Sequence, residues 1–192
     1  MSKDILEILF GSKIRVKVLK FLFRNFSSDF SVPELSRRIQ ESPAATRKEV
    51  QLLSQIKLVR KNGAQRFALN SGFEFFEELK LLIMKSSPAE KNKLVQRITR
   101  LGRIRLALIA GIFLNQNDSQ DGSVVDLFIV GDDISKERLR KFLKALEAEV
   151  GRELRLSIMD KEEFEYRYGM FDRFVRVMLE SPHEKIINKL GL

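Results

Sequence analysis

The sequence predicts an α+β protein with two domains, and three observations support this prediction. Residues 1–70 contain 14 Lys/Arg and 6 Asp/Glu, whereas residues 71–192 contain 21 and 20, so the positive charge is concentrated at one end. The basic part shows short amphipathic helical patterns followed by a hairpin signal. The remainder alternates strand and helix patterns, which is typical of a small α/β domain. A hydrophobic content of 44% is sufficient for packed cores.

Composition excludes several classes of site. The chain has no cysteine and a single histidine, so disulfides, thiolate metal sites and two-histidine zinc sites are excluded. No apolar run approaches the roughly 18 residues of a membrane-spanning helix, and the N-terminus lacks a cleavable signal pattern. We therefore expect a cytoplasmic protein with no cofactor, no bound metal and no membrane contact.

Capping signals predict the first two helices of the basic domain. The first helix follows Ser12 and runs to about Phe26, and its apolar residues recur at helical spacing. The second follows Ser31 and ends near Gln40. Ser31 and Glu34 have the spacing of a capping box, in which each side chain satisfies a free backbone N–H of the other.

The third helix is the candidate DNA-recognition element. Ser42 is the expected cap, Pro43 the first helical residue and Ile56 the approximate end. The face expected to point into the core contains Thr46, Val50, Leu53 and Ile56. The outer face contains Ala44, Ala45, Arg47, Lys48, Gln51 and Gln55. Two short helices joined by two or three residues, the second basic on its outer face, are typical of a helix-turn-helix.

A basic hairpin is predicted directly after this helix. Asn62-Gly63 lies between two extended segments, and this dipeptide favours a two-residue turn in which both positions have φ > 0. The hairpin carries Arg60, Lys61, Gln65 and Arg66. A helix, a helix-turn-helix and a basic hairpin in this order make up a winged helix.

A winged helix with this surface is expected to bind double-stranded DNA. The major groove is about 12 Å wide and admits one helix. The small side chains of Ala44 and Ala45 allow close approach, and Arg47, Lys48 and Gln51 can reach base edges. The hairpin residues Arg60, Lys61, Gln65 and Arg66 would contact phosphates or the adjacent minor groove. The alternative is a winged helix that makes only protein contacts.

The stretch SPAATRKEVQLLSQIKLV, residues 42–59, resembles the recognition helix of arsenic-repressor-type winged-helix regulators. In that family the helix ends in Gly-Leu-Val before the wing. Here Lys57 occupies the glycine position, so the turn into the wing is expected to differ. Those regulators often sense metals through Cys and His pairs. This chain lacks such pairs, and the resemblance does not extend to metal sensing.

Residues 73–88 are expected to form a connector between domain 1–72 and domain 89–192. An amphipathic helix with Phe75 or Phe76 and Leu79 on one side is predicted, ending at Ser86. Its aromatic residues either fill the core or contact a second copy. We expect a homodimer, because a winged helix that reads a two-fold DNA site usually needs a partner subunit.

The second domain is predicted to alternate helices and strands. The expected elements are a helix at 89–102, strands at 104–113 and 124–130 with a polar loop at 115–123 between them, a helix at 136–150, a strand at 154–159, and helices from 161 to the end.

The segments 106–113 (LALIAGIF) and 123–130 (SVVDLFIV) resemble the nucleotidyltransferase fold of the polymerase-beta-like superfamily. Active members carry Gly-Ser after the first strand, two Asp separated by one residue on the next, and a third carboxylate on a later strand. Gly111 and Asp126 match this pattern, but Ile112 replaces the serine and Val124 the first Asp. The stretch 154–159 has no carboxylate. The resemblance thus implies a vestigial site at Gly111 and Asp126 and no enzymatic activity, because one carboxylate rarely holds two divalent ions.

The C-terminal stretches 160–164, 172–174 and 179–182 resemble prokaryotic proteins in which a winged helix is fused to a nucleotidyltransferase-like domain. The resemblance then covers about residues 12–190. Three functions follow as hypotheses. The chain could be a DNA-binding transcriptional regulator whose second domain is a dimer contact, an effector pocket or a dock for an unidentified protein partner. It could instead be an active nucleotidyltransferase, or the antitoxin of a nucleotidyltransferase-type toxin–antitoxin pair. We expect the first.

Overall fold

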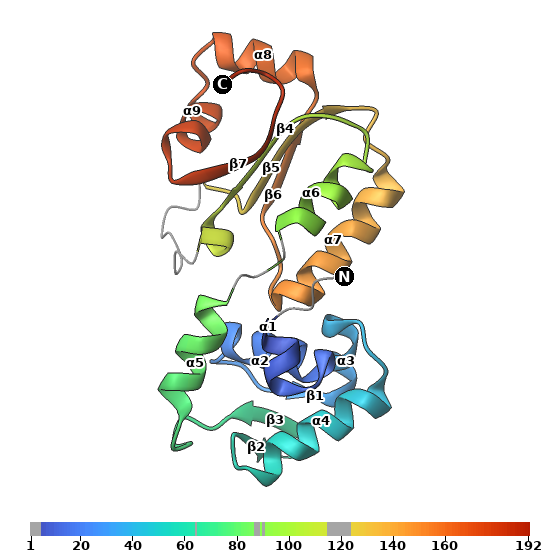
Figure 1. Ribbon diagram of the computed structural model, residues 1–192, viewed down its shortest axis with the longest axis vertical. Helices are drawn as coiled ribbons and strands as arrows, with labels where there is room; N and C mark the ends of the chain where they lie inside the picture. Colours follow the sequence, from blue (N-terminus) through green and yellow to red (C-terminus); the bar gives the residue numbers. More distant parts are fainter. Residues whose placement is uncertain (1–4, 64, 87–88, 90, 115–123) are drawn as a thin grey trace. The chain divides into compact units, whose positions relative to one another are not determined.

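The computed structural model describes residues 5–63, 65–86, 89, 91–114 and 124–192, which form mixed α and β structure (Figure 1). The chain divides into two compact units. Unit 1 comprises Met1–Ser86 and Ala145–Glu153, and unit 2 comprises Ser87–Lys144 and Leu154–Leu192. The segment expected to connect two domains contains α5 (Phe76–Lys85), which belongs to unit 1. The polar loop predicted at 115–123 lies outside the described residues.

Unit 1 combines helices with a small antiparallel sheet. Besides α5, its elements are α1 (Ile5–Phe10), α2 (Lys13–Arg24), β1 (Phe30–Ser31), α3 (Val32–Ile39), α4 (Pro43–Gln55), β2 (Val59–Asn62) and β3 (Arg66–Leu69). The sheet order is β1-β3-β2. The predicted caps are confirmed: Ser12 and Ser42 accept hydrogen bonds from backbone N–H groups of the first turns of α2 and α4, and Ser31 and Glu34 form the capping box of α3.

The core of unit 1 confirms most of the helical face predicted for α4. Val50 and Leu53 are buried in one cluster with apolar residues of α2, α3 and α5, and Thr46 is also buried. The prediction was wrong for Ile56, whose side chain is 54% exposed. Ile56 is the C-cap residue, where the backbone leaves the helical path, so the helical spacing no longer holds there.

The predicted hairpin is present, but its turn differs. Asn62 pairs with Arg66, so three residues, 63–65, connect β2 and β3 instead of two. Gly63 has φ 62° and Gln65 has φ 69°, whereas Asn62 remains in the strand. Three-residue hairpin loops commonly end with a residue in the left-handed region, and Gln65 takes that position.

Lys57 occupies a left-handed position at the end of α4. Its φ is 63°. The N–H of Lys57 donates to the Ser54 carbonyl at 3.0 Å, and the N–H of Leu58 donates to the Leu53 carbonyl at 3.1 Å. These two bonds define a Schellman motif, whose left-handed residue is usually glycine. The position at which the resembling regulators carry glycine therefore has the backbone conformation that favours glycine, and a lysine adopts it at a cost.

We predict that Lys57→Gly stabilises unit 1. Relief of the left-handed strain favours the variant by about 1–2 kcal/mol, and the greater backbone freedom of glycine in the unfolded chain offsets up to about 1 kcal/mol of this. The net gain of about 0.5–1 kcal/mol is measured as an increased urea midpoint by far-UV circular dichroism. Gln55→Gly, within the last turn of α4, is the control and should instead lose about 1 kcal/mol. Equal losses of stability in both variants would contradict the assignment of Lys57 to a strained left-handed position.

Unit 2 is built on a four-stranded sheet of order β6-β5-β4-β7. Its elements are α6 (Lys91–Thr99), β4 (Arg103–Ala110), the 3-10 turn η1 (Gly111–Leu114), β5 (Leu127–Asp132), α7 (Lys136–Val150), β6 (Leu156–Met159), α8 (Lys161–Gly169), α9 (Arg173–Glu180) and β7 (His183–Asn188), with the last residues of α7 assigned to unit 1. Among the strands that the structure describes in this sheet, only β5 and β6 pair in parallel. Helices α8 and α9 pack against one face of the sheet, where Phe128 meets Phe164 and Phe174. Figure 1 shows α6 and the start of α7 along the other face.

The C-terminal segment corrects the prediction that helices continue to the end. Residues 183–188 form β7, which pairs antiparallel with β4, and His183 lies opposite Ala110. Pro182 precedes the strand, and a proline disfavours helical backbone at the residue before it. Ile186 and Ile187 are β-branched, which suits a strand pairing with an otherwise open sheet edge. The helical interpretation missed this edge because it depends on contacts far away in the sequence.

Candidate nucleic-acid interface

The outer face of α4 presents the side chains that were predicted to read DNA. Arg47, Lys48 and Gln51 are exposed, Ala44 is exposed and Ala45 is half-buried. The opposite face is fixed in the core by Val50 and Leu53. The buried residues hold α4 in one orientation. The direction in which its cationic face points is therefore fixed by packing.

Glu49 is the residue on α4 whose role the sequence did not reveal. It is 7% exposed and faces the core. Its carboxylate accepts a hydrogen bond from the Ser12 hydroxyl at 2.6 Å and from Arg15 Nε at 2.8 Å, which ties α4 to the start of α2. Glu49 is the one acidic residue of α4. Its inward pairing leaves the outer face of the helix with cations and polar groups and no carboxylate.

The hairpin supplies a second group of exposed cations. Arg60 and Lys61 on β2 are exposed, and Gln65 lies exposed in the turn. Figure 1 shows α4 beside the β2–β3 hairpin, and the Schellman turn joins the helix directly to β2. The predicted recognition helix and the predicted wing are therefore adjacent within unit 1.

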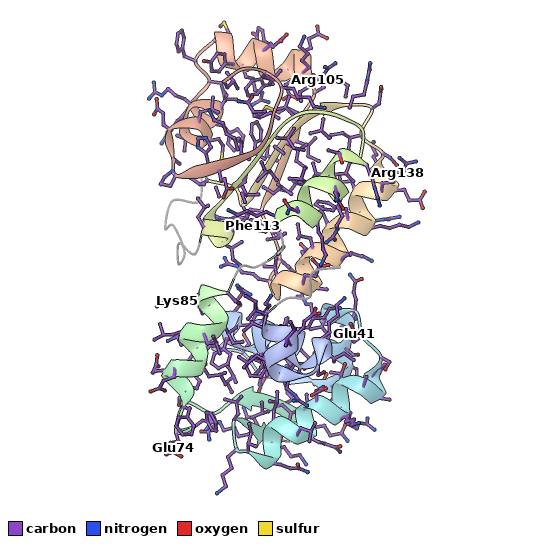
Figure 2. All side chains as sticks on the ribbon, in the orientation of Figure 1. Glu41, Glu74, Lys85, Arg105, Phe113 and Arg138 are labelled. Atoms are coloured by element: carbon purple, nitrogen blue, oxygen red, sulfur yellow. The ribbon has the colours of Figure 1, made fainter. Side chains whose placement is uncertain are left out.

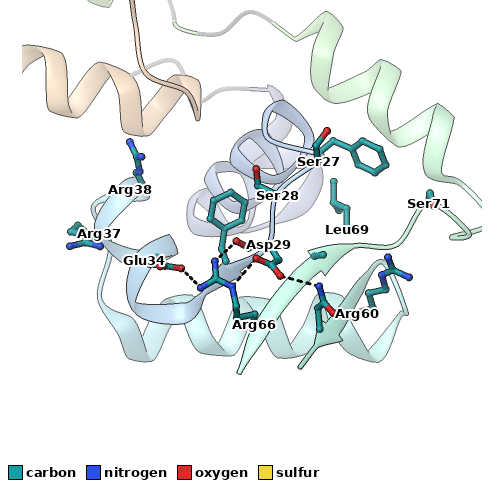
Figure 3. Close-up of a pocket in the computed structure, with 14 residues that line it drawn as sticks. Ser27, Ser28, Asp29, Glu34, Arg37, Arg38, Arg60, Arg66, Leu69 and Ser71 are labelled. Carbon is teal, nitrogen blue, oxygen red and sulfur yellow. Dashed lines mark hydrogen bonds and ion pairs between the residues drawn. The ribbon is translucent and has the colours of Figure 1, made fainter. Parts of the chain in front are cut away.

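Arg66 has other partners than the phosphates expected from the sequence. Its Nε donates to Asp29 Oδ1 at 2.7 Å and its Nη2 to the Asp29 carbonyl at 2.7 Å, while Nη1 lies 3.3 Å from Glu34 (Figure 3). Asn62 Nδ2 also donates to Asp29, at 3.0 Å. These contacts anchor β3 to the segment that precedes α3. Arg66 therefore anchors the hairpin, and its contact with DNA stays a prediction.

This anchor lines a surface hollow of about 790 Å³, drawn in Figure 3, between the hairpin and the start of α3. The hydrogen bond that Arg66 donates to the Asp29 carboxylate raises the pKa of Arg66 above its ordinary value. The pKa of Glu34 is lowered from 4.5, first by the backbone N–H of Ser31, then by the Ser31 hydroxyl and by Arg66. Both shifts favour the charged forms, so the contacts hold at neutral pH.

We predict that unit 1 loses stability in acid partly through Glu34. Because its pKa is lower in the folded than in the unfolded chain, its stabilisation is present above the ordinary value and disappears as pH falls through the lowered pKa. Glu34→Gln should be less stable than wild type at neutral pH, and the two should converge in acid. Urea unfolding across this pH range measures the difference. Parallel curves for the two proteins would contradict the role of Glu34.

The two residues of the predicted vestigial site lie together in unit 2. A Cβ added to Gly111 would lie 2.5 Å from Asp126 Oδ1, and Gly111 has φ +51°. Asp126 is 3% exposed, and its Oδ1 accepts from the N–H of Ile112 at 3.3 Å. Gly111 is thus required both by the backbone conformation and by the close carboxylate.

Arg155 is the partner of Asp126 that sequence reasoning missed. Its backbone N–H donates to Asp126 Oδ2 at 2.9 Å, and its Nε and Nη2 lie 3.4 Å from the two carboxylate oxygens. The positive charge beside the Asp126 carboxylate is therefore the guanidinium of Arg155, whereas in a metal-binding site it would be a metal ion. No grouping of three or more His, Cys, Asp or Glu suited to a metal occurs within the described residues. None of the helices in that part of the chain is both long and apolar enough to cross a membrane.

Comparison with known proteins finds no family model, no curated protein and no solved structure that matches this chain. The functional interpretation therefore depends on the geometry of the two units.

Proposed function

We propose that unit 1 is a winged-helix module that binds double-stranded DNA, and that the protein is a transcriptional regulator. The observation that carries this proposal is the outer face of α4. It exposes Arg47, Lys48 and Gln51, while its single carboxylate, Glu49, is buried and paired with Arg15. Arg and Gln side chains suit the hydrogen-bonding edges of bases in the major groove.

The hairpin supports the same function. Arg60 and Lys61 are exposed next to α4, and cations at this place would bind phosphates and fix the register of the helix on the duplex. Gln65, exposed in the turn, would contact phosphates or the adjacent minor groove. Arg66 contributes indirectly, because it holds the hairpin against Asp29.

A surface for protein contacts alone is less well supported. Protein interfaces are usually centred on buried aromatic or aliphatic anchors. The middle of the outer face of α4 carries Arg47, Lys48 and Gln51, and the large apolar residue exposed near this helix, Ile56, lies at its C-terminal end. The charge and the small residues Ala44 and Ala45 therefore favour a nucleic acid.

For unit 2, the proposal is a nucleotidyltransferase-like domain without transferase activity. Transfer of a nucleotidyl group needs divalent ions bridged by several carboxylates. Asp126 is engaged by Arg155 instead, and this contact supports a structural role for the carboxylate.

The proposal includes a homodimer formed through α5. Phe75, Leu81 and Leu82 are 56%, 55% and 41% exposed at the start and along this helix. A second copy covering them would also duplicate α4, as a two-fold DNA site requires. Light scattering should give twice the mass of one chain, and Leu81→Glu should return it to one. A wild-type protein that is monomeric at all concentrations would remove this part of the proposal.

Selection of bound fragments from a random duplex pool tests the DNA-binding function. We expect enrichment of a defined, two-fold related sequence, bound about 10³-fold or more tightly than random duplex at the same salt concentration. Recovery of an unenriched pool, with equal affinity for all duplexes, would overturn the proposed function.

A further inference from the structure

Unit 2 contains a second cationic surface that the charge balance of the sequence does not reveal. A hollow of about 380 Å³ lies between α6 and α7, and we call it the α6–α7 hollow. It is lined by Arg97, Arg100, Leu101, Arg138, Lys141 and Phe142. All six residues belong to unit 2. Figure 2 shows Arg138 on α7 pointing outward.

The hollow has an apolar floor and cations at its rim. Leu101 and Phe142 are buried, and the guanidinium of Arg97 lies 5.2 Å from the centre of the Phe142 ring. Arg138 Nη1 donates to the Arg100 carbonyl at 3.2 Å, just beyond the end of α6. These contacts fix two of the guanidinium groups before any ligand binds, so little side-chain entropy is lost on binding.

The charge of the hollow is unbalanced. Arg138 and Lys141 lie three residues apart on α7, which places them on one side of that helix, while Arg97 lies on α6 and Arg100 one residue beyond its end. Lys141 is paired with Glu137 at 2.5 Å, and the lining contains no carboxylate. The Arg100 side chain makes no hydrogen bond or ion pair to any residue that the structure describes.

Two cations of unit 2 outside the hollow are paired with carboxylates. Arg103 is paired with Asp133 at 2.8 Å and Lys91 with Glu184 at 2.6 Å. In the hollow, Arg100 and Arg138 have no carboxylate partner among the residues that the structure describes, so their charge is available to an anionic ligand.

We infer that the α6–α7 hollow binds the phosphate backbone of a nucleic acid. Guanidinium and ammonium groups are the usual partners of phosphate oxygens. Apart from the cations, the lining is apolar and contains no amide or hydroxyl side chain. A smaller hollow of about 200 Å³ adjoining the end of α6 adds Lys189 to the cationic surface. The other two cations that line it, Arg103 and Arg105, are paired with Asp133 and Asp132. This inference rests on the proposed function, because it gives unit 2 a ligand of the same class as the one proposed for unit 1.

The salt dependence of DNA binding tests the inference. The full chain is titrated with a fluorescent duplex of random sequence at several KCl concentrations, and the slope of log K against log[KCl] is measured. Arg100→Ala/Arg138→Ala should make this slope shallower by about two, because each lost phosphate contact removes about 0.9. Lys161→Ala/Arg176→Ala is the matched control. It removes the same charge from α8 and α9 of unit 2 and should leave the slope close to that of wild type.

Equal slopes in the hollow variant and its control would overturn the inference while leaving the proposed function intact, provided that wild type still binds its selected duplex. Failure of wild type to bind any duplex would overturn both. Poly-glutamate is included as a competitor. Displacement of duplex by poly-glutamate at lower concentration than by unlabelled duplex, in wild type and not in the hollow variant, would assign the hollow to an acidic protein and overturn the nucleic-acid ligand.

Discussion

Arg47→Ala/Lys48→Ala/Gln51→Ala is expected to abolish discrimination between the selected duplex and random DNA. A good base contact is worth about 1–3 kcal/mol, so the loss of three should weaken specific binding at least ~10²-fold. All three side chains are exposed on α4, and alanine is the best helix former, so the fold should be retained. Fluorescence anisotropy with both duplexes, at one salt concentration, measures the ratio of affinities.

Two controls make this result specific to α4. Lys161→Ala/Arg176→Ala removes the same net charge elsewhere and should keep the affinity ratio of wild type. Arg60→Ala/Lys61→Ala should weaken binding to both duplexes by a similar factor, because phosphate contacts carry no sequence information. If the α4 variant kept the wild-type ratio, base recognition would have to lie outside this helix.

Asp126→Ala is expected to destabilise unit 2 by about 3 kcal/mol, near the lower end of the range for a broken buried ion pair. The substitution leaves the Arg155 guanidinium and the N–H groups of Ile112 and Arg155 without their acceptor. The chain has two tyrosines and no tryptophan, and both tyrosines, Tyr166 and Tyr168, lie on α8. Intrinsic fluorescence therefore follows the unfolding of unit 2 alone.

The same measurement distinguishes a structural carboxylate from a metal ligand. Asp160→Ala removes the N-cap of α8 and should lower the free energy of unfolding of unit 2 by about 1 kcal/mol. It is the reference against which the effect of Asp126→Ala is compared. Added Mg²⁺ should leave the unfolding of wild type unchanged. Stabilisation by Mg²⁺ that disappears in Asp126→Ala would show that the site holds a cation, and would favour the nucleotidyltransferase hypothesis.

Helix starts were predictable because capping is a local interaction. Ser12, Ser31 and Ser42 each lie next to the N–H groups that they satisfy, so sequence neighbours alone define the start of α2, α3 and α4. The short strand β1 and the C-terminal strand β7 were missed. β1 is defined by its pairing with β3, and β7 by its pairing with β4, which are distant in the sequence. In addition, β1 has only two residues, too few to show a strand pattern.

The candidate interface was predictable to the extent that exposure follows helical periodicity. The face of α4 with Arg47, Lys48 and Gln51 followed from the buried stripe of the same helix. The pairing of Glu49 with Arg15, and of Arg66 with Asp29, joins residues 34 and 37 positions apart. Glu49 did carry a local signal, since it adjoins Val50 within the buried stripe. Arg155 carried none, because nothing in its neighbourhood indicates that it faces Asp126.

Chemical-shift mapping of the isotope-labelled full chain against the selected duplex tests the central claim most directly. We expect the largest changes in backbone amides of residues 44–55, followed by 59–69, and smaller changes around Arg100 and Arg138. Changes that spared α4 and the hairpin while the duplex was bound would contradict the account.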